Sequence, residues 1–167
     1  MSRSYTLFAA LERDHRKTLH QINRLYDVLT HLRYEGRQHR QENFREIKRL
    51  AGDLRKELKT HMKEEEKVLF PNLEVSIPKL EPLIDLLRFE HLDLDRRIDD
   101  LSDCIRRMSK LRGMTPERIQ ELNEQGTYFV CLLKGHMQLE SRSLYGIADQ
   151  QLKVFEKARI LKQIAIR

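Results

Sequence analysis

The chain has 167 residues, enough for one domain with a sizeable hydrophobic core. Charged residues make up 35% of it and apolar residues 40%, with four prolines, six glycines and no tryptophan, a composition that favours an all-helical soluble protein. No apolar run is long enough to span a bilayer and the first residues lack a signal-peptide core, so we expect a cytoplasmic protein with no membrane partner.

The formal net charge of +6 raises the question of nucleic-acid binding. Most of the excess lies at the C-terminal end, where residues 151–167 carry five basic side chains and one acidic one: Lys153, Lys157, Arg159, Lys162, Arg167 and Glu156. Elsewhere bases and acids are interleaved, which is typical of solvated helix surfaces. We therefore expect no nucleic-acid partner.

Apolar residues recur every three or four positions in the first half of the chain, as they do in amphipathic helices. This pattern predicts a helix over residues 4–34 that stops at Gly36, and a second over 41–70 that stops at Pro71. Tyr26 lies about three turns after the first histidine on the apolar face. We expect it to pack in the core.

A third helix is predicted from Pro82 to Gly113. The fourth has the clearest start in the chain, because Thr115 is a good N-cap and Pro116 suits the first helical position. It continues to about residue 144. Four amphipathic helices joined by short connections predict an all-α fold, an antiparallel up-down-up-down four-helix bundle.

The bundle should occupy residues 1–146, followed by a separate C-terminal segment over 147–167. In that segment a short fifth helix, about 151–166, sets apolar positions against the basic ones; the apolar set is Leu152, Phe155, Ile160, Leu161 and Ile164. Such a helix caps the bundle, makes a homodimer contact or binds a protein partner. We favour capping or dimerisation over membrane binding, and the sequence does not decide between them.

A motif of histidine, methionine and glutamate occurs twice in the chain. The pattern His-Met-x-x-Glu-x-x-x-Leu-aromatic runs from His61 to Phe70 and again from His136 to Tyr145. Residues four apart on a helix share a face, so each copy presents an imidazole and a carboxylate in one direction. Each copy therefore offers a pair of metal ligands.

Each copy is preceded by an acid–histidine pair at nearly the same interval. Asp14-His15 lies 46 residues before the first copy, counted between histidines, and Glu90-His91 lies 45 residues before the second. The chain is thus interpreted as a duplicated helical hairpin with a repeat of about 75 residues.

The predicted helix ends place the four histidines at one level of the bundle, each on an apolar face. A single buried histidine is usually a hydrogen-bonded core residue, but a layer of four with two carboxylates is costly to bury unless a cation compensates it. We therefore predict a metal site with six ligands: His15, His61, Glu65, His91, His136 and Glu140. No catalytic side chain is assigned.

Four imidazoles and two carboxylates are too many for one tetrahedral zinc ion. They suit two ions, each held by two histidines and bridged by Glu65 and Glu140. Nitrogen and oxygen ligands without thiolate indicate iron or manganese, with iron favoured. Each ion would keep open positions for a small ligand such as O₂ or NO.

The remaining histidines and both cysteines are expected to lie outside the site. His20, His31 and His39 have no counterpart in the repeat and should lie on the surface. Cys104 and Cys131 form no CxxC pair and lie off the histidine faces. We expect reduced cysteines that pack in the core and bind no metal.

Several acids near the motifs have other interpretations. Asp95 is in phase with the third histidine, so it is either a ligand or hydrogen-bond acceptor near the metal, or a solvent-facing acid paired with an arginine. Asp14 and Glu90 lie about 100° off the ligand face and should be surface groups or acceptors for a ligand. Glu64 and Glu66 are expected to point away from the site.

Over residues 5–146 the sequence resembles the hemerythrin-like (HHE cation-binding) proteins. The resemblance rests on four motifs: Asp14-His15, His61-x-x-x-Glu65 with Leu69-Phe70-Pro71, Glu90-His91, and His136-x-x-x-Glu140 with Leu144-Tyr145. It implies a four-helix bundle holding a non-haem di-iron centre. It also implies an oxo or hydroxo bridge between the irons, and chemistry that involves O₂, NO, peroxide or iron itself.

The pattern departs from oxygen-carrying hemerythrins, which have a fifth histidine where this chain has Asp95 and a carboxylate five, not four, residues after the last histidine. The 4-His, 2-Glu set is more similar to iron-centre repair proteins and to the hemerythrin-like domain of an iron-sensing ubiquitin-ligase subunit. We expect a di-iron protein that binds or reacts with O₂, NO or peroxide in sensing, scavenging or stress response. The alternatives are an iron-storing or iron-sensing module, a repair factor, and a structural helical protein without metal; enzymatic turnover is left open.

Overall fold

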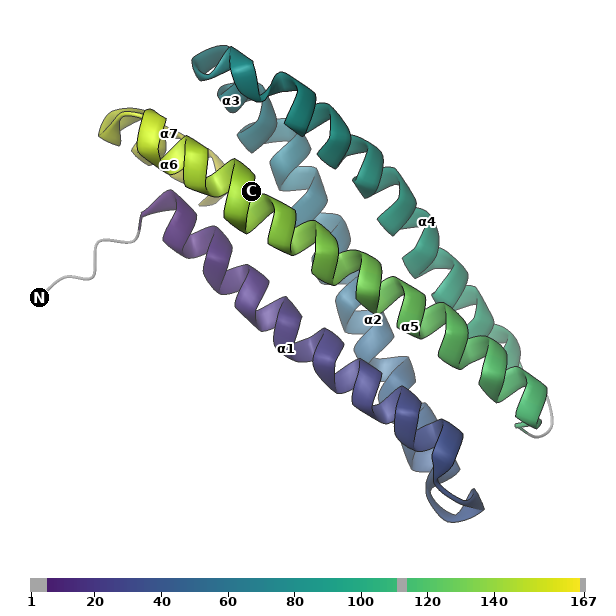
Figure 1. The fold of residues 1–167 in the computed structure, drawn as a ribbon. Helices are drawn as coiled ribbons and strands as arrows, with labels where there is room; N and C mark the ends of the chain where they lie inside the picture. Colours follow the sequence, from purple (N-terminus) through teal and green to yellow (C-terminus); the bar gives the residue numbers. More distant parts are fainter. Residues whose placement is uncertain (1–5, 111–113, 166–167) are drawn as a thin grey trace, which may run out of the picture.

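The computed structural model describes residues 6–110 and 114–165. In this part of the chain, four long helices run alternately up and down (Figure 1): α1 (Leu7–Tyr34), α2 (Arg40–Glu64), α4 (Glu81–Lys110) and α5 (Pro116–Leu139). Helix α1 packs against α2 and α5, and α4 packs against the same two helices. The predicted up-down-up-down four-helix bundle is confirmed.

The helices begin at residues whose side chains or turns suit a helix start. Thr115 caps α5 as predicted, its hydroxyl accepting a hydrogen bond from the backbone N–H of Arg118. Thr6 caps α1 in the same way through the N–H of Ala9. Short 3₁₀ turns, Arg37–His39 and Pro78–Leu80, lead into α2 and α4. The predicted stop of the third helix at Gly113 lies outside the described residues.

The prediction that Pro71 ends the second helix is wrong. After α2 the chain makes a π-helical turn, Glu65–Leu69, and continues as α3 (Phe70–Ser76). The N–H of Phe70 bonds to the carbonyl of Glu65, five residues back. The next residue would have lost its ordinary helical hydrogen bond beside this widened turn, so a proline without an N–H costs little there.

The fourth long helix also continues past its predicted end through a π-helical turn, at the position equivalent to that in the second. A π-helical turn, Glu140–Tyr145, follows α5, and the chain continues through Gly146 as α6 (Gly146–Gln151). The predicted end near residue 144 is therefore also wrong. Both copies of the histidine–glutamate motif lead into a π-helical turn that begins at the glutamate.

Two hydrophobic clusters fill the interior, one on each side of the histidine level. The larger contains the buried residues of the α1–α2 and α4–α5 connecting end, such as Leu29, Leu54 and Leu101. The smaller contains the other ends of the long helices together with α3 and α6, including Phe70 and Tyr145. The histidine layer therefore divides the core in two.

The C-terminal helix folds back onto the smaller cluster. Helix α7 (Val154–Ala165) contacts α1 and the first π-helical turn, and Ile160 is fully buried there. Polar side chains fasten it to α3, with Gln163 accepting a hydrogen bond from Asn72. The predicted apolar face is wrong at Phe155, which is 64% exposed because it stands about 140° around the helix from the buried Ile160.

Two further core predictions are wrong. Tyr26 is 44% exposed, because the apolar face of α1 drifts away from it over three turns. Cys131 is also exposed, whereas Cys104 is buried in the larger cluster as expected; both thiols are free. Among the described helices, none combines the length and apolarity needed to cross a membrane.

Replacing Gly126 with alanine is expected to destabilise the bundle, because the new methyl carbon would lie 2.4 Å from Cδ1 of the buried Leu29. Overpacking costs about 1–3 kcal/mol, which outweighs the gain of roughly 1 kcal/mol that alanine brings over glycine in a helix. Urea-unfolding midpoints measure the effect.

The matched control for that substitution is Gly52→Ala in α2, where no atom lies within 4 Å of the new methyl carbon. Helix propensity alone then acts, so this variant should be more stable than the wild type. A Gly126→Ala midpoint that rises as much as that of Gly52→Ala would contradict the close approach of α5 and α1.

Candidate metal centre

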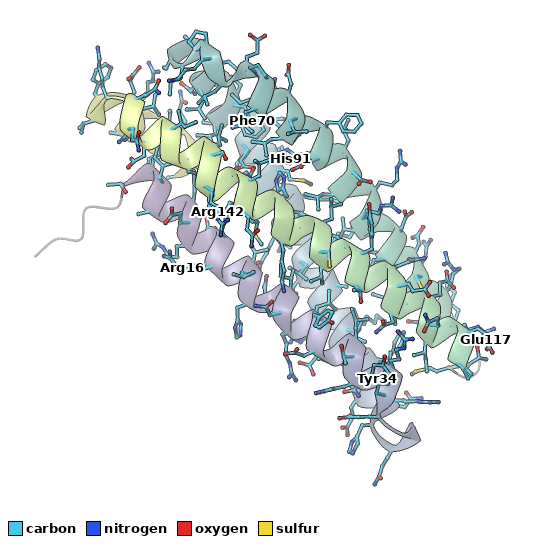
Figure 2. The ribbon with its side chains drawn as sticks, viewed as in Figure 1. Arg16, Tyr34, Phe70, His91, Glu117 and Arg142 are labelled. Atoms are coloured by element: carbon cyan, nitrogen blue, oxygen red, sulfur yellow. The ribbon has the colours of Figure 1, made fainter. Side chains whose placement is uncertain are left out.

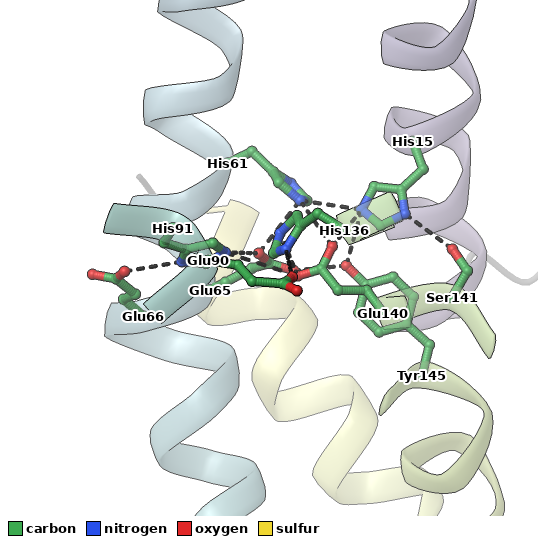
Figure 3. Close-up of polar contacts among 10 residues, drawn as sticks. All are labelled: His15, His61, Glu65, Glu66, Glu90, His91, His136, Glu140, Ser141 and Tyr145. Atoms are coloured by element: carbon green, nitrogen blue, oxygen red, sulfur yellow. Dashed lines mark hydrogen bonds and ion pairs between the residues drawn. The ribbon is translucent and has the colours of Figure 1, made fainter. Parts of the chain in front are cut away.

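Each long helix brings one histidine to the same level of the bundle (Figure 3): His15 on α1, His61 on α2, His91 on α4 and His136 on α5. The imidazole rings form two pairs. Ring centroids lie 5.0 Å apart for His15 and His61, and 4.9 Å apart for His91 and His136. The expected layer is thus present.

The two carboxylates of the repeated motif lie between these histidine pairs. Glu65 and Glu140 are 1% and 0% exposed, and each stands at the start of a π-helical turn. Potential ligand atoms gather in two groups, within 4.8 Å of one another in each: His15, His61, Glu65 and Glu140; and Glu65, His91, His136 and Glu140. Both carboxylates belong to both groups.

The Nε2 atoms of all four histidines face the carboxylate oxygens. Glu140 lies 3.2 Å from His15 through Oε2 and 3.2 Å from His136 through Oε1. Oε2 of Glu65 lies 3.4 Å from His61 and 3.4 Å from His91. Each carboxylate therefore reaches one histidine of each pair, as a bridging ligand must.

The donor set fits metal ions better than it fits a closed polar network. Five buried atoms at the centre have no hydrogen-bond partner among the described residues: Glu65 Oε2, His91 Nε2, His136 Nε2, Glu140 Oε1 and Glu140 Oε2. Buried polar atoms are normally satisfied, because leaving them unpaired costs about 1–3 kcal/mol each. All five belong to predicted ligands and converge on the same space, which a pair of cations would satisfy.

The outer nitrogens of three histidines are hydrogen-bonded. Nδ1 of His91 lies 2.9 Å from Oε1 of Glu66, and Nδ1 of His136 lies 2.8 Å from Oε2 of Glu90. Nδ1 of His15 lies 3.0 Å from the hydroxyl of Ser141. Such bonds hold the ring and leave Nε2 free as the metal-binding nitrogen.

Tyr145 adds a hydroxyl to the centre. This fully buried phenol donates a hydrogen bond to Oε1 of Glu65 at 2.7 Å and lies 3.2 Å from Nε2 of His15. Burial, and then the charges of Glu140 and Glu65, raise the pKa of Tyr145 well above 10. The phenol therefore stays neutral and orients Glu65.

Without metal, protons provide the positive charge that the carboxylates require. Burial lowers the pKa of His61, but Glu65 and Glu140 outweigh it and raise the pKa to about 9. The same balance of burial against the carboxylates raises the pKa of His91 to about 9 and that of His136 to about 10.

The facing carboxylate responds in the opposite sense. Burial alone would raise the pKa of Glu140, but the positive charge of His136, 3.2 Å away, and the close approach of His15 and His61 hold that pKa well below 4.5. The centre thus keeps its carboxylate ionised and needs cations, either protons or metal ions, close to it.

The structure decides between the two interpretations of Asp95. Its side chain is 48% exposed and forms an ion pair with Lys59 at 2.7 Å. The solvent-facing interpretation is therefore supported, with a lysine in place of the expected arginine. Asp14 is exposed as expected, and so are the three remaining histidines, His20, His31 and His39.

The expectation that Glu66 points away from the site is wrong. It lies one residue, about 100°, past Glu65, and from there its carboxylate reaches Nδ1 of His91, as Glu90 on the regular helix α4 reaches Nδ1 of His136. Sequence reasoning also missed the contacts of Ser141 and of the Tyr145 hydroxyl. The repeat contained a usable signal, because Glu66 and Ser141 occupy equivalent positions in the two copies and both hydrogen-bond to a histidine.

Two surface pockets reach the His15–His61 side of the centre. One, of about 250 Å³, lies between α1 and α5, and His15 and Ser141 are among its lining residues. The other, of about 280 Å³, lies between α1 and α2 and includes Asp14 and His61. Small molecules therefore have short routes from solvent to these two imidazoles.

The sequence was compared with protein families and with curated proteins. The family model described as Hemerythrin HHE cation binding domain matches residues 6–148, which include all six predicted ligands and end within α6. No curated protein matches the chain.

The metal-free protein is expected to lose stability as the pH rises through about 9 to 10. Histidines with raised folded-state pKa values contribute stability that is complete below 6.5, their unfolded pKa, and disappears as they deprotonate. Glu140 has a lowered pKa, so its contribution is present above 4.5 and lost only as the pH falls. Urea midpoints measured from pH 6.5 to pH 10 test this.

Bound metal ions provide the control for this pH dependence. They replace the protons, so the loaded protein should show a smaller alkaline decline than the metal-free protein. His20→Ala, which removes an exposed histidine, should leave the metal-free profile unchanged. A metal-free midpoint that stays level across the range would show that the imidazolium–carboxylate contacts contribute little.

Proposed function

The chain belongs to the hemerythrin HHE cation-binding family, and we propose that it is a non-haem di-iron protein that binds or reacts with O₂, NO or peroxide. The observation that supports the proposal most directly is the pair of overlapping groups of two histidines and two glutamates. Two groups that share both carboxylates suit two neighbouring metal ions better than one.

The ligand types favour iron at these positions. Imidazole and carboxylate donors without thiolate suit iron or manganese, and the two free cysteines take no part in either group. Two iron ions held by His15, His61, Glu65, His91, His136 and Glu140 would supply redox chemistry toward O₂, NO or peroxide.

The surrounding side chains prepare the site for such ligands. Tyr145 fixes Glu65 through its hydroxyl, while Glu66 and Glu90 fix the rings of two histidines. The two hydrophobic clusters close the layer on both faces and exclude bulk water from it. Access remains through the pockets beside His15 and His61.

A structural role without metal explains the site less well. Unpartnered atoms on Glu65, His91, His136 and Glu140 would destabilise a bundle that used the layer only for packing. Apolar residues of similar size would fill the same layer without that cost. A metal-binding role accounts for the convergence of these atoms.

Metal analysis of anaerobically purified protein tests the proposal. Two irons per chain are expected, with near-ultraviolet absorption that changes when O₂ or NO is admitted. Protein that holds no iron, takes up none when Fe²⁺ is offered, and responds to neither gas would overturn the proposed function.

Substitution of the ligands should reduce the metal content. His61→Ala and Glu65→Ala are each expected to lose at least one of the two ions, because His61 serves one group and Glu65 serves both. His20→Ala, on the exposed face of the same bundle, is the control and should keep both ions. Metal content unchanged in both ligand variants would exclude these residues as ligands.

A further inference from the structure

The duplicated motif gives the two halves of the centre equivalent positions that hold different residues. The residue after the bridging glutamate is Glu66 in the first copy and Ser141 in the second. Each hydrogen-bonds to Nδ1 of a histidine on a neighbouring helix, Glu66 to His91 and Ser141 to His15. One half of the centre thus has a carboxylate where the other has a neutral hydroxyl.

A second equivalent pair differs in the same direction. Glu90 precedes His91 and binds Nδ1 of His136 at 2.8 Å. Its counterpart before His15 is Asp14, whose side chain is one carbon shorter. Asp14 is exposed and lines the same open pocket as His61, but no hydrogen bond joins the two among the described residues. The two carboxylates that hydrogen-bond to a histidine Nδ1, those of Glu66 and Glu90, therefore both lie in the His91–His136 half.

The two halves also differ in exposure. The side chains of His91 and His136 are 2% and 1% exposed, whereas those of His15 and His61 are 8% and 18% exposed. A pocket does lie beside His91, but Glu66 also lines it and stands against Nδ1 of that ring. The His15–His61 half is the more open one.

The aromatic residues that stack on the histidines add a third difference. Phe70 stacks on His91, with centroids 5.5 Å apart, and its equivalent Tyr145 stacks on His15, with centroids 5.2 Å apart. Only the tyrosine brings a hydroxyl to the layer. The wall beside His15 therefore carries the hydroxyl that holds Glu65, whereas the wall beside His91 is an apolar ring.

Basic side chains surround the mouth of the pocket that leads to His15. Arg16, Lys134 and Arg142 all line it, and Figure 2 labels Arg16 on α1 and Arg142 on the π-helical turn that follows α5. Together with Glu12, which also lines the pocket, these side chains leave a net positive charge at its mouth, and that charge attracts anions. The route therefore suits a small neutral or anionic ligand.

From these differences we infer that the two metal positions are inequivalent in affinity: the His91–His136 position retains its ion, and the His15–His61 position exchanges its ion. The inference rests on the proposed di-metal function. A carboxylate on the outer nitrogen makes an imidazole a stronger donor, and its loss typically costs about 10- to 100-fold in metal affinity. The retaining position has two such carboxylates and the exchanging position has none.

Anaerobic Fe²⁺ binding to the metal-free full chain, measured by equilibrium dialysis with metal analysis, tests the inference without any activity assay. Two binding steps are expected, the first at least ~10-fold tighter. Glu66→Gln and Glu90→Gln remove the charge but keep the side-chain length, and each should weaken the first step by about 10- to 100-fold. Glu121→Gln, at the start of α5, is the matched control and should change neither step.

Gain of affinity provides a test that misfolding cannot imitate. Ser141→Glu places a carboxylate where the first copy has Glu66, with the pocket between α1 and α5 giving room for it. It should tighten the second step and narrow the difference between the two. A chelator should remove the ions in the reverse order of binding, with a fast phase from the His15–His61 position that Ser141→Glu slows and a slow phase from the His91–His136 position that Glu90→Gln accelerates.

The possible outcomes separate the two proposals. Equal affinities for both ions, or a second step that Ser141→Glu does not tighten, would overturn the inequivalence while leaving a di-metal protein. Failure of the wild type to take up Fe²⁺ would overturn the proposed function and this inference together. Stepwise uptake with the expected variant effects supports the inequivalence even if neither O₂ nor NO reacts.

Discussion

The structure depends on two carboxylates that are buried at mid-height in a helix bundle. Glu65 and Glu140 are almost fully enclosed, and ionised carboxylates in such a place require positive charge nearby. Each of the four long helices places one histidine beside these carboxylates, so groups that can carry or bind positive charge surround the two carboxylates. The same requirement explains why the hydrophobic core is interrupted: a polar layer must cross the bundle, and the apolar residues divide into one cluster above it and one below.

Duplication of one helical hairpin explains how the chain places four histidines beside two buried carboxylates with one short motif used twice. Two helical hairpins with nearly the same histidine spacing, 46 and 45 residues, build a layer with approximate two-fold symmetry, because similar intervals place the histidines at similar heights. The symmetry stops at the residues that support the ligands. The position that holds Glu66 in the first copy holds Ser141 in the second, and the position of Phe70 holds Tyr145. The histidines and glutamates of the two halves are alike, whereas the residues that contact the outer nitrogens and stack on the rings are not.

The sequence predicted the heights of side chains well and their rotations poorly. The level of the histidines follows from the rise per residue, which is nearly constant in any α-helix, so the six ligands could be brought together from spacing alone. Rotation accumulates error along a helix, and Tyr26, three turns from His15, is exposed for this reason. The π-helical turns after α2 and α5 have no clear propensity signal in the sequence, so the ends of both helices were predicted wrongly. Contacts between helices, such as that of Ser141 with His15, require the assembled bundle.

The π-helical turns account for the aromatic walls of the centre. In a regular helix, a residue five positions after a bridging glutamate would stand about 140° away from it, outside the core. The widened turn adds one residue, so Phe70 and Tyr145 return to the inner face and stack on His91 and His15. The buried positions then continue with equal spacing in both copies: Phe70, Leu73 and Ile77; and Tyr145, Ala148 and Leu152. A single backbone irregularity, repeated by duplication, thus joins the polar layer to the apolar cluster beneath it. It also places the Tyr145 hydroxyl, which Phe70 lacks, beside Glu65.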